Sequence, residues 1–180
     1  LALAYAQSHP RACAALFLRG IFLLRKKELH WFYQQGASKI FPDQWEGFLA
    51  PIPEEERGDL LKAYYKRLSG EKSPEQIRAA KAWAMWEGAT SRLIPDPNHA
   101  SLFGEEDFAY AFSRIESHYF INRGFFKDEE ELLDGVSKIR SIPSVIVHGR
   151  YDVVCPIESA WELHKRWPEA QFHIVGDAGH

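Results

Sequence analysis

The chain has 180 residues, of which 46% are hydrophobic and 26% are charged, values typical of a globular domain with a sizeable core. Its net charge of −3 argues against nucleic acid or a membrane surface as a partner. The two cysteines, Cys13 and Cys155, form neither a C-x-x-C pair nor a metal-ligand spacing. That usage fits a reducing compartment, so we expect a cytoplasmic protein.

The first elements in chain order are a helix end and a strand. Residues 1–8 follow a helical pattern that ends at His9, because the residue before a proline disfavours helix. The pattern is already under way at Leu1, without a capping residue or an initiator methionine, so we expect a fragment of a longer protein. The apolar run 12–18, closed by Gly20, predicts a strand buried on both faces, as in a parallel sheet.

The middle of the chain changes to helices separated by proline and glycine. The expected helices are residues 27–34, 54–68, 74–91 and 107–122. The third has the clearest start, because Ser73 can cap it, Pro74 suits the first helical position and Gln76 stands at the capping-box position.

Strand and helix alternate again near the end of the chain. Residues 144–147 and 171–175 are expected strands, and residues 156–167 the helix between them. This strand–helix–strand order with short connections predicts a parallel sheet and therefore an α/β fold. The expected division is a core segment 1–24, a helical cap 25–131 and a second core segment 132–180.

Two loops at predicted strand ends carry residues suited to acid–base chemistry. Asp152 follows the strand 144–147, and His180 follows the strand 171–175. The two residues are 28 positions apart in the chain. Carboxyl ends of parallel strands meet at one edge of a sheet, where ligands bind. A buried Asp that accepts the Nδ1–H of a His fixes its tautomer and stabilises the imidazolium formed during catalysis. Asp177 is the rival acid, but its place within the histidine loop favours a turn role.

The nucleophile of such a site is not in the sequence. The chain contains no G-x-S-x-G, H-E-x-x-H, P-loop or G-x-G-x-x-G motif. In α/β-hydrolases the order is nucleophile, acid and base, with the nucleophile on a strand-to-helix turn. We therefore expect the serine upstream of Leu1, and the 180-residue chain alone to be inactive.

A family resemblance covers the whole chain and keeps its order. The segments that carry it are Leu1-Ala-Leu-Ala-Tyr-Ala-Gln-Ser-His-Pro10, Leu18-Arg-Gly-Ile-Phe-Leu-Leu-Arg25, Trp31-Phe-Tyr-Gln34, Trp83-Ala-Met-Trp-Glu87, Arg114-Ile-Glu-Ser-His-Tyr-Phe120 and His148-Gly-Arg-Tyr-Asp152. They resemble the successive motifs of prolyl aminopeptidases (proline iminopeptidases). The resemblance implies an α/β-hydrolase fold with an inserted helical cap, and a Ser–His–Asp peptidase that releases an N-terminal proline from peptides. It implies no metal and no organic cofactor.

Two glutamates carry the substrate specificity in this interpretation. At helical spacing, Glu87 shares a face with Trp83, and Glu116 lies beside Phe112 on another helix. A single acid on an aromatic stripe most simply sits at its edge and reaches water, because burying an unpaired charge is costly. The resemblance instead implies that Glu87 and Glu116 bind the free amine of the substrate.

The resemblance also implies an apolar slot for the proline ring. Phe22 and Phe32 match positions that flank the ring, although Phe32 stands where a tyrosine is expected. Cys155 matches a position close to the site, and from the residues alone it is a small buried hydrophobe. The alternatives that stay open are another capped α/β-hydrolase, such as an esterase or epoxide hydrolase, and a non-catalytic binding domain of the same fold.

Overall fold

The computed structural model describes residues 1–180, except for the side chains of residues 97 and 100. The chain forms two compact units. The core unit comprises Leu1–Glu28 and Phe126–His180, and the helical unit comprises Leu29–Phe125. The expected division into core, cap and core segments stays a prediction for the whole protein.

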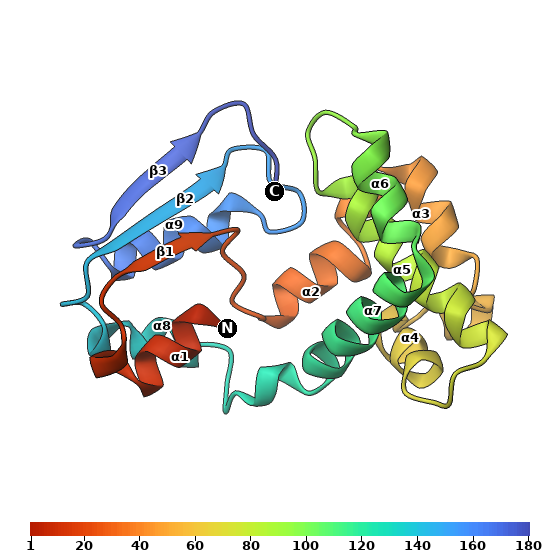
Figure 1. Ribbon diagram of the computed structural model, residues 1–180, viewed down its shortest axis with the longest axis horizontal. Helices are drawn as coiled ribbons and strands as arrows, with labels where there is room; N and C mark the ends of the chain where they lie inside the picture. Colours follow the sequence, from red (N-terminus) through yellow and green to blue (C-terminus); the bar gives the residue numbers. More distant parts are fainter. The chain divides into compact units, whose positions relative to one another are not determined.

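The core unit contains a parallel sheet of three strands in the order β1-β2-β3 (Figure 1). The strands are β1 (Leu16–Arg19), β2 (Ser144–Gly149) and β3 (Gln171–Val175). In the register, Leu18 of β1 pairs with Ile146 of β2, and His148 of β2 pairs with Ile174 of β3. The α/β fold with a parallel sheet is therefore confirmed.

Short helices and turns pack their apolar side chains against this sheet. They are α1 (Ala2–Ser8), η1 (Pro10–Ala12), α8 (Glu131–Asp134), η5 (Gly135–Lys138) and α9 (Ile157–Arg166). One hydrophobic cluster joins Leu3 of α1, Ile146 of β2 and Leu163 of α9. The amide of Gln7 ties α1 to α8 by donating to the Leu132 carbonyl at 2.7 Å. These contacts hold the strands in place at the edge where the predicted site residues lie.

The first strand is shorter than the sequence pattern predicts. Residues 10–12 form the η1 turn instead, because Pro10 suits the start of a helical turn and cannot pair in a sheet interior. Phe17 is 82% exposed, whereas Leu18 is buried in the hydrophobic cluster. The expectation that this strand is buried on both faces is therefore wrong for the described chain, since successive side chains point to opposite faces and only one face is packed.

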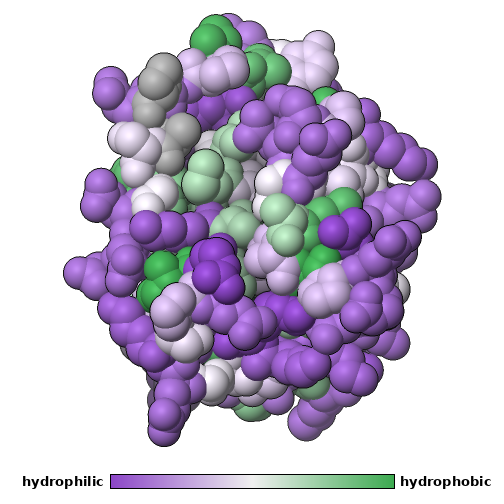
Figure 2. All heavy atoms as spheres, turned by 90° about the vertical axis from the view of Figure 1, so that its right-hand side faces the viewer, coloured by the Kyte–Doolittle hydropathy of each residue, from purple (hydrophilic) through white to green (hydrophobic). Residues whose placement is uncertain are grey.

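The helical unit is built around two long helices, α5 (Pro74–Thr90) and α7 (Glu106–Ile121). The remaining elements are α2 (Lys26–Tyr33), which starts in the core unit, η2 (Ala37–Lys39), α3 (Pro42–Leu49), η3 (Glu54–Glu56), α4 (Leu60–Leu68), α6 (Pro97–Gly104) and η4 (Arg123–Phe125). Fully buried aromatic side chains form its centre, among them Phe48, Tyr64, Trp83 and Trp86. The face seen in Figure 2 is mostly hydrophilic, with apolar atoms in small groups. Trp83 and Trp86 thus belong to the core of this unit.

Three of the four expected helices occur within about one residue of their predicted ends. The remaining expected helix, residues 54–68, is wrong, because η3 and α4 take its place. A new helix starts there because Asp59 caps α4 by accepting the Lys62 N–H at 3.1 Å. Ser73 caps α5 as expected, but the Gln76 side chain donates to the carbonyls of Leu68 and Gly70 instead of completing a capping box. The helices α3 and α6 were not predicted.

No helix among the described residues is both long and apolar enough to cross a lipid bilayer.

Candidate active site

The loops that follow β2 and β3 are held together by their backbones. The Arg150 N–H donates to the Val175 carbonyl at 2.9 Å, and the Tyr151 N–H donates to the Ala178 carbonyl at 3.0 Å. Gly149 ends β2 so close to the carbonyls of the second loop that a Cβ there would overlap them. The parallel strands therefore bring both loops to one edge of the sheet.

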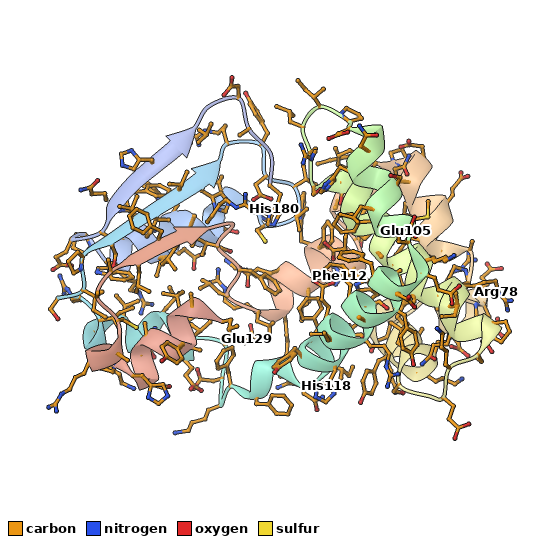
Figure 3. All side chains as sticks on the ribbon, in the orientation of Figure 1. Arg78, Glu105, Phe112, His118, Glu129 and His180 are labelled. Carbon is orange, nitrogen blue, oxygen red and sulfur yellow. The ribbon has the colours of Figure 1, made fainter. Side chains whose placement is uncertain are left out.

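This arrangement brings the two predicted catalytic residues into contact. The Nδ1 of His180 lies 2.9 Å from Oδ2 of Asp152, and the Cys155 N–H donates to Oδ1 of the same carboxylate at 2.8 Å. Asp152 is buried, whereas His180, labelled in Figure 3, stands beyond the carboxyl ends of the strands and is partly exposed. Asp177 is exposed, so the rival acid is not the buried partner of the imidazole.

The geometry of this pair suits acid–base chemistry. Asp152 holds Nδ1 of His180, so Nε2 is the nitrogen that can take up a proton from a nucleophile. A carboxylate buried next to the ring stabilises the imidazolium that would result. Its second oxygen is occupied by the backbone of Cys155, which fixes the plane of the carboxylate.

Glycine is required where the chain leaves β1. Gly20 has a φ of +57°, a conformation that other residues rarely adopt, and a Cβ at this position would lie 2.8 Å from Cε1 of His180. The backbone of Gly20 thus forms a wall against the imidazole ring. The sequence pattern identified Gly20 only as the end of a strand.

The segment after Gly20 carries Phe22 and is anchored by a buried glutamate. The Glu28 carboxylate accepts the N–H of Leu23 at 3.3 Å and the N–H of Arg25 at 2.8 Å, and the Ser159 hydroxyl donates to it as well. The bond to the residue preceding α2 is the glutamate half of a capping box. Phe22 is half-buried in this anchored segment.

The helical unit contains a second acidic site, made by Glu87 on α5 and Glu116 on α7. The Tyr33 hydroxyl donates to Glu87, and the indole Nε1–H of Trp83 donates to Oε2 of Glu116 at 2.9 Å. The rings of Tyr33 and Trp83 stack with their centroids 4.4 Å apart. Two carboxylates thus lie beside stacked aromatic rings, and each accepts a hydrogen bond from a rigid aromatic side chain.

Burial disfavours the ionised form of both carboxyl groups. It raises the pKa of Glu87 well above its usual range, the charge of Glu116 raises this pKa further, and the hydrogen bond from Tyr33 opposes the shift. Burial likewise raises the pKa of Glu116, against the hydrogen bond from Trp83. Two such carboxylates favour the binding of a cation near both of them, because the cation offsets their mutual repulsion and pairs with their charges.

The other predicted substrate-binding residues lie in different surroundings. Phe32 is 3% exposed and packs on Trp86, whose indole N–H donates to the Phe32 carbonyl at 3.2 Å. Cys155 is buried behind Asp152 in the core unit. A role in holding the substrate stays a prediction for Phe22, Phe32 and Cys155.

No group of three or more His, Cys, Asp or Glu side chains suited to a metal ion occurs among the described residues.

Sequence reasoning missed the residues that support the predicted site. Tyr33 and Trp83 were placed only in aromatic motifs, yet each donates to one glutamate. A signal was available, because buried tyrosine and tryptophan usually find a partner for their polar tips, and an acid is a natural one. Glu28 gave a weaker signal, as the third residue of a helix.

Comparisons with known proteins match the whole chain. The sequence model of a family described as alpha/beta hydrolase fold matches residues 1–180. The chain is 59% identical to a probable proline iminopeptidase of Leptolyngbya boryana and 53% identical to a proline iminopeptidase of Xylella fastidiosa, each over 180 residues, or 100% of this chain. It is 55% identical to a proline iminopeptidase of Arabidopsis thaliana over 181 aligned residues.

The chain spans only part of these relatives, namely 56% of the Leptolyngbya protein, 58% of the Xylella protein and 48% of the Arabidopsis protein. The predicted resemblance to proline iminopeptidases is confirmed at the level of sequence.

Proposed function

Because the chain belongs to the alpha/beta hydrolase family, we propose that the full-length protein is a serine peptidase that releases an N-terminal proline from peptides. The observation that carries the proposal is the pair of the buried Glu87 and the half-buried Glu116, whose raised pKa values suit a site for a cationic amine. The names of the relatives, proline iminopeptidases at 53–59% identity, support the same activity.

In this proposal the core unit carries out the chemistry. A serine outside the 180 residues attacks the carbonyl carbon of the N-terminal residue, and Nε2 of His180 takes the serine proton. Asp152 stabilises the imidazolium through Nδ1. The tetrahedral intermediate collapses as His180 returns the proton to the leaving amine, which breaks the peptide bond. Water, with His180 again as base, then releases proline from the acyl-enzyme.

The glutamates supply the selectivity for a free N-terminus. The secondary ammonium of an N-terminal proline carries two N–H donors and one positive charge. The donors can bind one carboxylate each, and the charge stabilises carboxylates whose ionised form is otherwise disfavoured. A peptide whose first amine is blocked offers neither charge nor donors. Glu87 and Glu116 therefore bind the amine, while the Tyr33 hydroxyl and the Trp83 indole hold the carboxylates in position.

The test uses two substrates, only one of which carries an amine in its ring. Proline arylamide carries the ammonium group, whereas an aryl ester of cyclopentanecarboxylic acid has the same ring size and lacks the nitrogen. Removing one partner of a buried charge pair typically costs about 2–5 kcal/mol. In the full-length protein, E87Q and E116Q should each lower kcat/KM for the arylamide by roughly 30- to 4,000-fold. Hydrolysis of the ester should change far less.

Glu105 offers a matched control, since it is an exposed acid just before α7, and E105Q should leave both substrates unaffected (Figure 3). If E87Q and E116Q cleave the arylamide with the kcat/KM of the wild type, the two glutamates do not bind the amine.

A further inference from the structure

A second histidine lies next to the candidate acid. His148 is the fifth residue of β2, and its side chain is 0% exposed. Its Nδ1 accepts the N–H of Ile21 at 3.2 Å. Its Nε2 lies 2.8 Å from the Cys155 carbonyl oxygen and 3.5 Å from Oδ2 of Asp152. One ring thus contacts both the segment after β1 and the loop that carries the acid.

These contacts determine where the ring of His148 carries its proton. A backbone N–H can only donate, so Nδ1, which faces Ile21, must present its lone pair. The proton is therefore on Nε2, where the Cys155 carbonyl is the nearer acceptor. The ring of His148 is accordingly held in a fixed direction by its two backbone partners.

The fixed direction matters for Asp152, because two imidazole rings compete for the same oxygen. Oδ2 lies 2.9 Å from Nδ1 of His180 and 3.5 Å from Nε2 of His148. The Cys155 carbonyl accepts the hydrogen bond from Nε2 of His148. The shorter and stronger contact of Oδ2 is therefore the one with His180.

We propose that His148 is a positioning residue for the Asp152–His180 pair, an inference that rests on the proposed function. It holds the backbone of Ile21, next to the glycine that faces His180, and the backbone of Cys155, whose N–H binds Asp152. It thereby positions both the Gly20 backbone and the Asp152 carboxylate against the ring of His180. His148 does not touch the substrate, so its effect passes through the acid and the base.

The experiment compares three replacements in the full-length protein. H148L introduces an apolar side chain that has neither polar atom. H148Q can place an N–H donor near the position of Nε2, and H148N can reach only the position of Nδ1. A misplacement of about 1 Å at a reacting group can cost 10²-fold, so H148L should lower kcat on proline arylamide by roughly 30- to 100-fold. KM should change less than about threefold, because uniform binding is untouched.

The amide replacements make the test independent of the stability of H148L. H148Q should exceed H148N in kcat by about tenfold, because only glutamine restores the donor to Cys155 and so the direction of Asp152. Equal kcat values for H148Q and H148N, or a wild-type kcat for H148L, would overturn the inference. His164 on α9 is a part-buried histidine of the same unit, and H164L should leave kcat unchanged.

A second readout separates this inference from the proposed function. The proton between His180 and Asp152 should give a downfield NMR resonance in the resting protein, without any substrate. We expect H148L to shift or broaden this resonance and H148Q to restore it. A protein that fails to cleave proline arylamide, yet shows this pattern and the same order of rates on an aryl ester, would refute only the peptidase activity. An unchanged resonance in H148L would refute the positioning role.

Discussion

The Nδ1 of His180 lies 2.9 Å from Oδ2 of Asp152, although 28 residues separate them in the chain. The contact depends on two parallel strands that end at one edge of the sheet and on loops joined by backbone hydrogen bonds. Asp152 alone would not indicate a catalytic site, since an aspartate after a strand is usually a turn residue. Their contact, with the carboxylate buried, is the arrangement on which the proposed chemistry depends.

Replacing Asp152 by asparagine tests the acid. D152N keeps the shape of the side chain but favours the wrong tautomer of His180, so kcat on proline arylamide should fall by roughly 10³- to 10⁴-fold with KM nearly unchanged. D177N, at an exposed position of the neighbouring loop, is the matched control and should retain most activity. Steady-state kinetics of the full-length variants give the answer, and the reverse order of effects would assign the acid to Asp177.

Replacing Gly20 by alanine tests the wall against the imidazole. The new Cβ would lie 2.8 Å from Cε1 of His180, at a φ of +57° that costs other residues roughly 1–2 kcal/mol. We expect kcat to fall by about 10- to 100-fold, because the base is displaced. G47A on α3 is the control, since a Cβ there meets nothing within 4 Å. It should keep full activity and stabilise the helix by about 0.5–1 kcal/mol.

The acidic pair should leave a signature in the dependence of stability on pH. Burial raises the pKa values of Glu87 and Glu116 above the unfolded value of about 4.3. The folded protein therefore binds more protons than the unfolded chain from about pH 4.3 up to the raised pKa values, and their contribution to stability is lost as pH rises through this window. The neutral variants E87Q and E116Q avoid this loss.

Urea unfolding followed by tryptophan fluorescence at pH 5 and at pH 8 measures the effect. The free energy of unfolding of E87Q and E116Q, relative to wild type, should increase between the two pH values. Glu56 provides a control of opposite sign, because the hydrogen bonds from Arg67 and Lys66 lower its pKa to about 2. It is ionised in both states over this range, so the difference between E56Q and wild type should stay constant. A constant difference for all three variants would contradict the raised pKa values.

Local patterns in the chain were sufficient for the α/β fold and for most elements. The strand at residues 171–175 occurs as predicted, and the capping residue Ser73 does bind the N–H of Gln76. Both signals depend on neighbouring residues only, through apolar runs and helix caps. The same local reasoning failed at Asp59, where a capping side chain starts a new helix inside an apparently continuous pattern.

Contacts between distant segments were beyond such reasoning. That the Tyr33 hydroxyl donates to Glu87, and that His148 joins Ile21 to Cys155, depends on where the fold places each segment. A hydrogen bond needs two atoms within about 3.5 Å, and periodicity does not give a distance between residues on different strands or helices. Burial adds a second reason, because it decides whether an acid such as Glu87 on an aromatic face reaches water or has its pKa raised.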